Sequence, residues 1–354
     1  MNNAPMGPLD RRLLRRVAET LLFGVVGGGA LQATGFPAGW LCGSMAGVMA
    51  AALMGRLLIV PDGLRGGAFI LLGASMGTAL TPETVEKMET WPVSIAMLML
   101  SVAATMMVGT QYLIRQHGWD VASARLSSVP GALSAVLAIA SDVKGDTARI
   151  TISQTLRQIV LVCLVPVLLY FGPEAVLVAR PPDADLVDLV LMLAAGSAGG
   201  LVCARLGVPG GLLVGALLGS GGLHAAGGVA GVVPQPLLVF SYVVVGSAIG
   251  SRLRGTRISV IVATLRPALG SIAAAIGIAA LFAGATSVLT GLPFNEVWLA
   301  FAPGGVEAMT ILAFILNLDP SFVSAHHVIR LIALMLLSPL WTMGLPRIGR
   351  PDEG

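Results

Sequence analysis

The chain has 354 residues, of which 56% are hydrophobic and 11% charged, with a formal net charge of +3 and a mean hydropathy of +0.89. Soluble domains carry about 25% charged residues, so this composition excludes a soluble globular protein. The small positive excess lies at the ends of apolar segments rather than in one basic patch, which excludes a nucleic-acid partner. The sequence predicts an all-α polytopic membrane protein with the lipid bilayer as its solvent.

Apolar runs that could cross a bilayer recur along the chain. In the first half the predicted spans are 15–34, 37–55, 64–81, 92–114 and 147–171, and a short apolar stretch lies at 127–141. The second half repeats this order with spans at 186–205, 209–226, 236–251, 267–290 and 321–344, and the counterpart of the short stretch lies at 297–316. The predicted organisation is a cytoplasmic segment 1–14, repeat 1 at 15–171, a periplasmic linker 172–185, repeat 2 at 186–344 and a cytoplasmic tail 345–354.

The two halves are predicted to be copies of one unit. The segment 35–43 aligns with 207–215, and at nearly the same offset the following pairs match: Pro130-Gly131 with Pro303-Gly304, Asp146 with Asp319, Arg157 with Arg330, and Pro166 with Pro339. These matches involve rare Pro, Gly, Asp and Arg rather than interchangeable aliphatic residues. A duplication explains them better than chance.

The short stretch in each half decides how the copies are oriented. If it is re-entrant, each half has five crossings and the copies are inverted; if it spans, each half has six and they are parallel. With five crossings and a cytoplasmic N-terminus, every Lys and Arg outside the spans except Lys87 and Arg180 falls inside. With six, the basic residues divide almost evenly. The positive-inside rule therefore favours two inverted-topology repeats, each with about five transmembrane helices and one short re-entrant or broken helix.

A helix-breaking proline beside glycine interrupts both short stretches, at Pro130-Gly131 and at Pro303-Gly304-Gly305. Inverted repeats with interrupted helices are typical of secondary transporters, whose site lies at the breaks near the midplane. The amides at the start of a half-helix suit an anion. These five residues are therefore predicted to bind substrate, and a kink that binds no ligand is the alternative.

Two arginines occupy equivalent positions in the last span of each repeat, Arg157 and Arg330. An arginine at bilayer depth costs about 2.5–3.5 kcal/mol to insert, so its presence indicates a function. Both guanidiniums are predicted to bind a carboxylate or phosphate of the substrate. Snorkelling, or a structural ion pair with an acidic residue, is the alternative.

Five further residues are predicted to couple transport to H+ or Na+. They are Glu307, His326, His327, Asp146 and Asp319. An intramembrane carboxylate or imidazole suits proton transfer, but Glu307 could equally pair with Arg330. The two aspartates precede helices, where N-capping is the simpler role. Adjacent histidines cannot share one helix face, so no metal site is predicted, and no cofactor is expected.

Around these breaks the sequence resembles the AbrB family of bacterial membrane proteins, whose name is shared with an unrelated soluble DNA-binding regulator. The similar segments are Phe36-Pro37-Ala38-Gly39-Trp40-Leu41-Cys42-Gly43, Pro130-Gly131-Ala132-Leu133-Ser134, Gln154-Thr155-Leu156-Arg157, Ala302-Pro303-Gly304-Gly305-Val306-Glu307-Ala308-Met309, Asp319-Pro320 and His326-His327-Val328-Ile329-Arg330. Ala132 departs from the family, in which the glycine pair often continues. The resemblance covers nearly the full chain.

The resemblance implies a transporter fold and a link to regulation of gene expression, and the family also carries an ammonia monooxygenase label. Four dispersed histidines speak against an oxygenase metal site and against an enzyme. The leading hypothesis is a secondary transporter of a small anionic solute in the bacterial inner membrane, with both termini cytoplasmic. The alternative is a membrane sensor that influences gene expression without moving a solute. Gly-rich faces would suit a homodimer or tight monomeric packing.

Overall fold

The computed structural model describes residues 11–79, 91–131, 133–140, 143–170 and 182–346. Within these ranges the regular structure is helical apart from isolated bridge residues, among them the pair Asp183 and Val232. The chain is therefore an all-α protein, as the composition predicts. Most of the predicted terminal segments and much of the linker lie outside the described residues, so the domain boundaries stay predictions.

The helices follow one order in each half. The first half contains α1 (Arg11–Ala33), α2 (Gly39–Leu53), α3 (Asp62–Met76), η1 (Gly77–Ala79), α5 (Trp91–His117), α6 (Val121–Ser128), α7 (Leu133–Ala140) and α8 (Thr147–Tyr170). The second half contains α9 (Leu186–Arg205), α10 (Gly211–Ala225), α11 (Gln235–Gly250), η3 (Ser251–Leu253), α12 (Ile258–Thr290), α13 (Phe294–Phe301), α14 (Val306–Ile315), α15 (Pro320–Leu336) and α16 (Ser338–Thr342).

Among the described residues, five helices are long and apolar enough to cross a membrane: Trp91–His117, Thr147–Leu169, Leu186–Arg205, Gln235–Leu253 and Ile258–Thr290. This confirms a polytopic membrane protein. The spans predicted at 37–55 and 209–226 are shorter apolar helices, Gly39–Leu53 and Gly211–Ala225. Two other spans have bounds that differ from the predicted ones. The span predicted at 267–290 begins at Ile258, and that at 321–344 divides into α15 and α16 because Pro339 opens a new helix.

In the region of each short apolar stretch the structure has two half-helices rather than one helix, and the first pair begins at Val121, before the predicted start at 127. The first half-helices, α6 and α13, have 8 residues each, or about 12 Å at 1.5 Å per residue, which is too short to cross the bilayer. In the first repeat the chain returns to its starting point, because the amide of Asp146 donates to Ser123 Oγ at 2.7 Å. The α6–α7 segment is therefore a hairpin.

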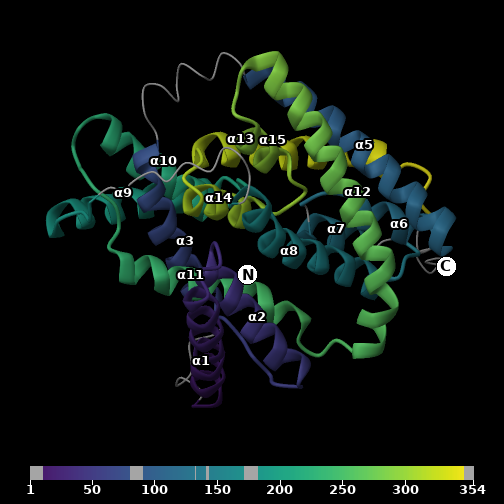
Figure 1. The fold of residues 1–354 in the computed structure, drawn as a ribbon, viewed down its shortest axis with the longest axis horizontal. Helices are drawn as coiled ribbons and strands as arrows, with labels where there is room; N and C mark the ends of the chain where they lie inside the picture. The colour runs from purple at the N-terminus through teal and green to yellow at the C-terminus, as the bar shows by residue number, and fades with distance from the viewer. Residues whose placement is uncertain (1–10, 80–90, 132, 141–142, 171–181, 347–354) are drawn as a thin grey trace, which may run out of the picture.

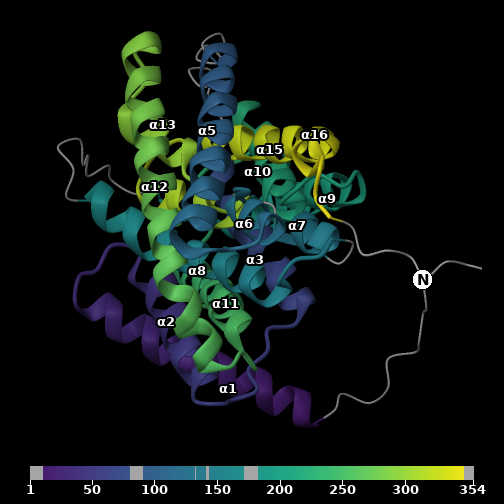
Figure 2. The same cartoon turned by 90° about the vertical axis from the view of Figure 1, so that its right-hand side faces the viewer.

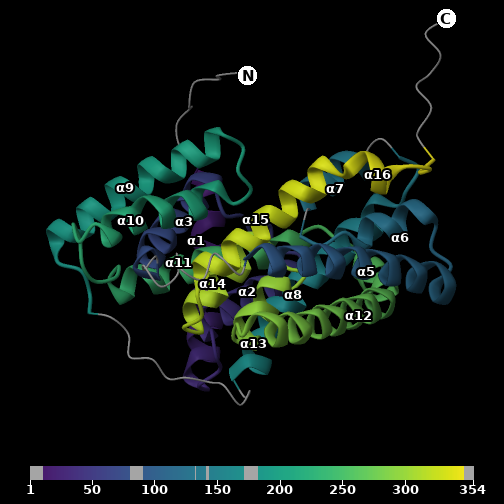
Figure 3. The same ribbon diagram turned by 90° about the horizontal axis from the view of Figure 1, so that it is seen from above.

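The helices form two groups, and each group takes members from both halves (Figure 1). Group A contains α1, α2, α3, α9, α10 and α11. Group B contains α5–α8 and α12–α16. Figure 3 shows the two groups side by side, and Figure 2 shows the long helices α5 and α12 of group B running along one another.

Equivalent helices of the two halves make equivalent contacts with the opposite half. Helix α2 packs on α11, and its counterpart α10 packs on α3. The same exchange appears at single residues, because Gly73 lies against the carbonyl oxygen of Leu213 and Gly246 against that of Leu41. Glycine at these contacts lets helices approach closely, which drives packing inside a bilayer. The halves are therefore equivalent in packing as well as in sequence.

Candidate functional site

The two helix breaks begin where a proline follows an extended residue. Val129 (φ −65°, ψ 123°) precedes Pro130 at the end of α6, and Ala302 (φ −52°, ψ 135°) precedes Pro303 at the end of α13. A proline ring disfavours the helical conformation of the residue before it. The prolines therefore end both half-helices at equivalent positions, as the sequence predicts.

The breaks touch one another through Gly131 and Gly304. A Cβ atom on Gly131 would lie 2.6 Å from the Gly304 carbonyl oxygen and 2.7 Å from Arg330 Nη2. Gly131 also has a φ of +77°, which side chains rarely allow. Only glycine fits this position, and the absence of a side chain brings the two breaks into contact.

Arg330 is fully buried and binds the backbone of the second break. Its Nη1 donates to the Ala302 carbonyl at 2.7 Å, and its Nη2 donates to the Gly304 carbonyl at 2.6 Å. Nη2 also lies 2.7 Å from His327 Nδ1, which accepts from it, while His327 Nε2 donates to the Leu299 carbonyl at 3.1 Å. The guanidinium thus caps the C-terminal end of α13, where the helix dipole favours a cation.

Arg157 has the same position at the first break. Its Nη1 donates to the Ser127 carbonyl at 3.2 Å and its Nη2 to the Val129 carbonyl at 2.6 Å, and Nη2 also donates to Gln154 Oε1. Gln154 Nε2 donates to the Leu126 carbonyl at 2.8 Å. Each arginine therefore stabilises its own break, a structural role that the sequence analysis did not separate from substrate binding.

A small polar cavity lies where the breaks cross. Its volume is about 10 Å³, and it is lined by Gly131, Gln154, Arg157, Gln158, Pro303, Gly304 and Gly305. Five of the seven predicted substrate-binding residues therefore surround one point. Pro130 and Arg330 are not part of this lining, although Arg330 contacts Gly304 directly. Gly305 is the N-cap of α14, so the positive end of that helix borders the cavity.

A second cavity of about 10 Å³ lies on the other side of Arg157, between α5, α6, α8 and α12. Ser127 and Ser153 line it, and both hydroxyl groups lack a hydrogen-bond partner among the described residues. A cavity of this size with polar walls has room for about one water molecule. Arg157 therefore faces polar space on two sides, whereas Arg330 lines neither cavity.

Glu307 lies beyond the cavity, at the start of α14. Its Cγ would be 3.7 Å from a Cβ on Gly210, at the start of α10. None of the ion pairs found in the described ranges involves Glu307, Arg157 or Arg330. The predicted alternative, a Glu307–Arg330 pair, is therefore not formed in this conformation.

His326 points away from the breaks, toward the N-terminal end of α5. Its Nδ1 donates to the Phe322 carbonyl at 2.9 Å, and its Nε2 lies 2.7 Å from Ser94 Oγ. The rings of Trp91 and Phe322 pack against it, with centroids at 5.7 Å and 4.0 Å. The structure therefore separates the two neighbouring histidines, since only His327 contacts an arginine.

The two aspartates cap helices. Asp319 accepts hydrogen bonds from the amides of Ser321 and Phe322 at the start of α15, at 2.8 and 3.2 Å. Asp146 accepts from the amide of Arg149 at 3.0 Å and pairs with the Arg149 guanidinium at 3.1 Å. Neither lines the crossing cavity. Their predicted role in coupling stays a prediction.

Sequence reasoning missed the role of two glutamines. Gln154 positions Arg157, and Gln158 closes one side of the cavity, with Nε2 3.1 Å from where a Cβ on Gly305 would lie. The sequence contained evidence for this role, because the spacing of Gln154, Arg157 and Gln158 places their side chains on one helix face. In the part of the chain that the structure describes, no three His, Cys, Asp or Glu residues form a group that could hold a metal ion.

Comparisons with known proteins agree with the resemblance at the breaks. The family profile described as "Transition state regulatory protein AbrB" matches residues 40–345. A Bacillus subtilis protein named "Uncharacterized protein YhjN" is 29% identical over 349 aligned positions, which cover 88% of each chain. An Escherichia coli protein named "Putative regulator AbrB" is 27% identical over 319 positions, covering 86% of this chain and 88% of the relative. The chain belongs to the AbrB family, whose profile spans both helix breaks and both buried arginines.

Proposed function

We propose that this membrane protein is a secondary transporter of a small anionic solute, and that it binds the solute where the two helix breaks cross. The observation that carries the proposal is the pair of buried guanidiniums, Arg157 and Arg330, which meet backbone carbonyls but no carboxylate. Each cation keeps its charge at bilayer depth, where isolated charge is costly. A bound anion would neutralise that charge, and the cavity lined by Arg157 marks where the anion would bind once the crossing opens.

An inverted arrangement of the repeats supports alternating access around this site. We infer that the α6–α7 hairpin returns to the side of the membrane from which it enters, which would give the first repeat an odd number of crossings. Two contacts between loops of different repeats agree. Arg254 Nη1 donates to the Leu58 carbonyl at 3.1 Å, and the Lys144 amide donates to the Pro346 carbonyl at 2.8 Å. With parallel repeats each pair would lie on opposite sides of the membrane.

The distribution of Lys and Arg among the loops indicates which side of the membrane each loop faces. The inverted arrangement with a cytoplasmic N-terminus keeps nearly all loop arginines and lysines inside. We therefore place the protein in the bacterial inner membrane with both termini in the cytoplasm. Reporter fusions after Arg56 and after Gly228 should report opposite sides, cytoplasmic and periplasmic. The same side for both would contradict the inverted arrangement.

Transport requires the crossing to open, because its present volume of about 10 Å³ has room for one water at most. Groups A and B are the natural moving parts, since each is built from both repeats. Glu307 is the best candidate for a coupling H+ or Na+ site. It lies between the second break and α10 of group A, and its carboxylate has no ion pair with a described residue.

Proteoliposomes test the proposal directly. Purified protein would be given inorganic phosphate, succinate or benzoate under an inward H+ or Na+ gradient, with uptake measured by electrical recording on a solid-supported membrane. We expect saturable uptake of at least one anion. Arg157→Gln should lower it at least tenfold, because Gln cannot supply the charge, whereas Arg205→Gln at the exposed end of α9 should leave it unchanged. No uptake of any of these anions under either gradient would count against transport.

A sensor that binds a solute without moving it is the second candidate. It is favoured by the name of the Escherichia coli relative, which calls that protein a regulator. A sensor and a transporter would share the arginine site but differ in flux. Binding of an anion that depends on Arg157, with no uptake in proteoliposomes, would decide for the sensor. An enzyme is not proposed, since the residues that line the two cavities at the breaks include neither a histidine nor a carboxylate.

A further inference from the structure

A much larger pocket lies apart from the crossing of the breaks. Its volume is about 420 Å³, within the range of small-molecule sites. It is lined by Gln32, Gly35, Phe36, Pro37, Ala38, Trp40, Leu41, Val232, Gln235, Leu238, Tyr242, Phe314, Ile315 and Asn317. We call it the corner pocket, because it lies at the corner between α1 and α2. It also takes walls from α11 of group A and from the end of α14 of group B.

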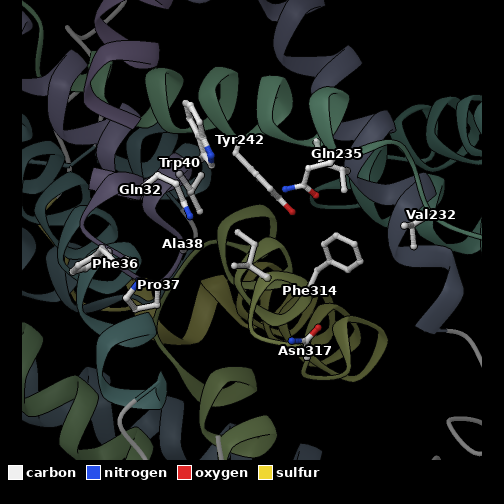
Figure 4. Close-up of a pocket in the computed structure, with 14 residues that line it drawn as sticks. Gln32, Phe36, Pro37, Ala38, Trp40, Val232, Gln235, Tyr242, Phe314 and Asn317 are labelled. Atoms are coloured by element: carbon white, nitrogen blue, oxygen red, sulfur yellow. The ribbon is translucent and has the colours of Figure 1, made fainter. Parts of the chain in front are cut away.

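The side chains of the corner pocket have a consistent chemistry. Figure 4 shows Gln32, Gln235 and Tyr242 extending into it from one side, opposite Phe314 and Asn317. Its aromatic lining residues are Phe36, Trp40 and Phe314, and its polar side chains are the carboxamides of Gln32, Gln235 and Asn317 and the phenol of Tyr242. None of the residues that line the pocket is charged. The pocket therefore differs from the crossing of the breaks, where a guanidinium faces the cavity.

The backbone of the corner pocket is strained at two places. Among the described residues, Ala38 (φ 57°) and Asn317 (φ 55°) are the only non-glycine residues with positive φ, and both line this pocket. Asparagine tolerates this conformation, but alanine does so at a cost of roughly 1–2 kcal/mol. The equivalent of Ala38 in repeat 2 is Gly210, which has the same conformation without the penalty. Strained residues of this kind concentrate at ligand sites.

We propose that the corner pocket is a second binding site, and that its ligand is an uncharged small molecule with an aromatic face and amide or hydroxyl groups. The aromatic walls would pack on the flat face of the ligand, and the carboxamides of Gln32, Gln235 and Asn317 would bond its polar groups. A charged ligand would lose hydration and meet no opposite charge. The proposal does not depend on transport of an anion.

The site has a mechanical consequence. Because Gln32 and Gln235 belong to group A and Asn317 follows α14 of group B, a ligand that contacts all three bridges the groups. A ligand that binds one arrangement of the groups preferentially stabilises that arrangement. Since α14 begins at the second break, occupancy of the corner pocket would favour the closed crossing.

Matched pairs of compounds that differ in charge provide the test. We would titrate the full chain in nanodiscs with nicotinamide and nicotinate, benzamide and benzoate, and uridine and uridine 5′-monophosphate, and follow tryptophan fluorescence and heat. We expect at least one uncharged member to bind at one per chain, and its anionic partner to bind at least tenfold more weakly. Trp40→Phe should reduce the fluorescence change and leave the heat signal.

Binding to variants of the corner-pocket residues is the second part of the test. Gln235→Ala and Asn317→Ala should each weaken binding at least fivefold, whereas Gln111→Ala, an exposed glutamine of α5 outside the lining, should not. Gel filtration and thermal unfolding would confirm that each variant is folded. The proposal is overturned if no uncharged compound binds, if the anionic partners bind as tightly, or if the pocket variants bind like the parent. Native mass spectrometry that finds a phospholipid retained by the parent and lost in Gln235→Ala would also overturn it.

Discussion

The two helix breaks share one hydrogen-bond pattern but differ in access. In the first break Gln154 accepts from Arg157 and donates to the Leu126 carbonyl; in the second, His327 accepts from Arg330 and donates to the Leu299 carbonyl. The donors and acceptors occupy equivalent positions of the two repeats. The breaks diverge beyond this pattern, because Arg157 lines both cavities at the crossing and Arg330 lines neither.

Comparing the two breaks separates the features that hold the broken backbone in place from those that could serve a ligand. An arginine that caps the first half-helix, and a neutral group that orients it, are present twice and therefore belong to the architecture. The two cavities at the crossing adjoin Arg157 and not Arg330, so in the proposed site the first break is the half that would meet a solute. Predictions that alter one break and leave its counterpart intact separate these roles.

Removing the arginine of the closed break should have the largest effect on folding. Arg330→Leu leaves the Ala302 and Gly304 carbonyls and His327 Nδ1 buried without their donor. Since each such group costs about 1–3 kcal/mol, we expect a loss of at least roughly 3 kcal/mol. Arg157→Leu should cost less, because water in the adjoining cavities can reach the freed carbonyls. Thermal midpoints in one detergent compare them, and equal losses would contradict the difference in access.

A methyl group at the crossing should have the next largest effect. In Gly131→Ala the new Cβ meets the Gly304 carbonyl oxygen at 2.6 Å, and alanine must keep a φ near +77°. Left-handed conformation costs about 1–2 kcal/mol and overpacking roughly 1–3 kcal/mol. Gly35→Ala is the matched control, because Gly35 has a φ of +74° and nothing within 4 Å. If both variants lose equal stability by chemical denaturation, the contact between the breaks contributes nothing.

The membrane-spanning helices, the two helix breaks and their meeting at one point could be predicted from the sequence. Spans and breaks were predictable because apolar length and Pro-Gly pairs act locally, and equivalence of Pro130 with Pro303 followed from the duplication. Contact between Gly131 and Gly304 could be expected from a pseudo-twofold axis. The structure then placed Gly131, Arg157, Pro303, Gly304 and Gly305 around one cavity.

Hydrogen-bond partners could not be predicted in the same way. Arg330 and Arg157 were expected to face a ligand, yet most of their donors meet carbonyls that only the broken backbone presents. The direction of His326, toward Ser94 on α5, depends on packing between helices far apart in sequence. The corner pocket was missed because its polar residues come from three segments far apart in the sequence, namely α1, α11 and the residues after α14, and no sequence spacing relates these segments.

Serine substitutions beside the two equivalent positions His326 and Ser153 test the comparison with smaller expected effects. Ser94→Ala removes the hydroxyl beside His326 Nε2, which then lacks a partner while fully buried, and should cost about 1–2 kcal/mol. Ser153 is the repeat-1 equivalent of His326, and its hydroxyl has no partner among the described residues. Ser153→Ala should therefore be nearly neutral. Midpoints of thermal unfolding measure both, and a larger loss for Ser153→Ala would indicate an ordered water in the cavity it lines.

Exchanging the two orienting groups should have the smallest effect, although it removes a buried histidine. In His327→Gln the amide oxygen can accept from Arg330 and the amide nitrogen can donate to the Leu299 carbonyl, as Gln154 does at the first break. We expect a stability change below about 1 kcal/mol, whereas His327→Ala should cost about 1–3 kcal/mol because both partners lose their bond. The pH dependence of anion uptake is the decisive measurement, because a glutamine side chain cannot take up or release a proton. If His327→Gln keeps the pH dependence of anion uptake, His327 only orients Arg330. If that dependence disappears, His327 carries the coupling proton, and the two breaks differ in function at this residue.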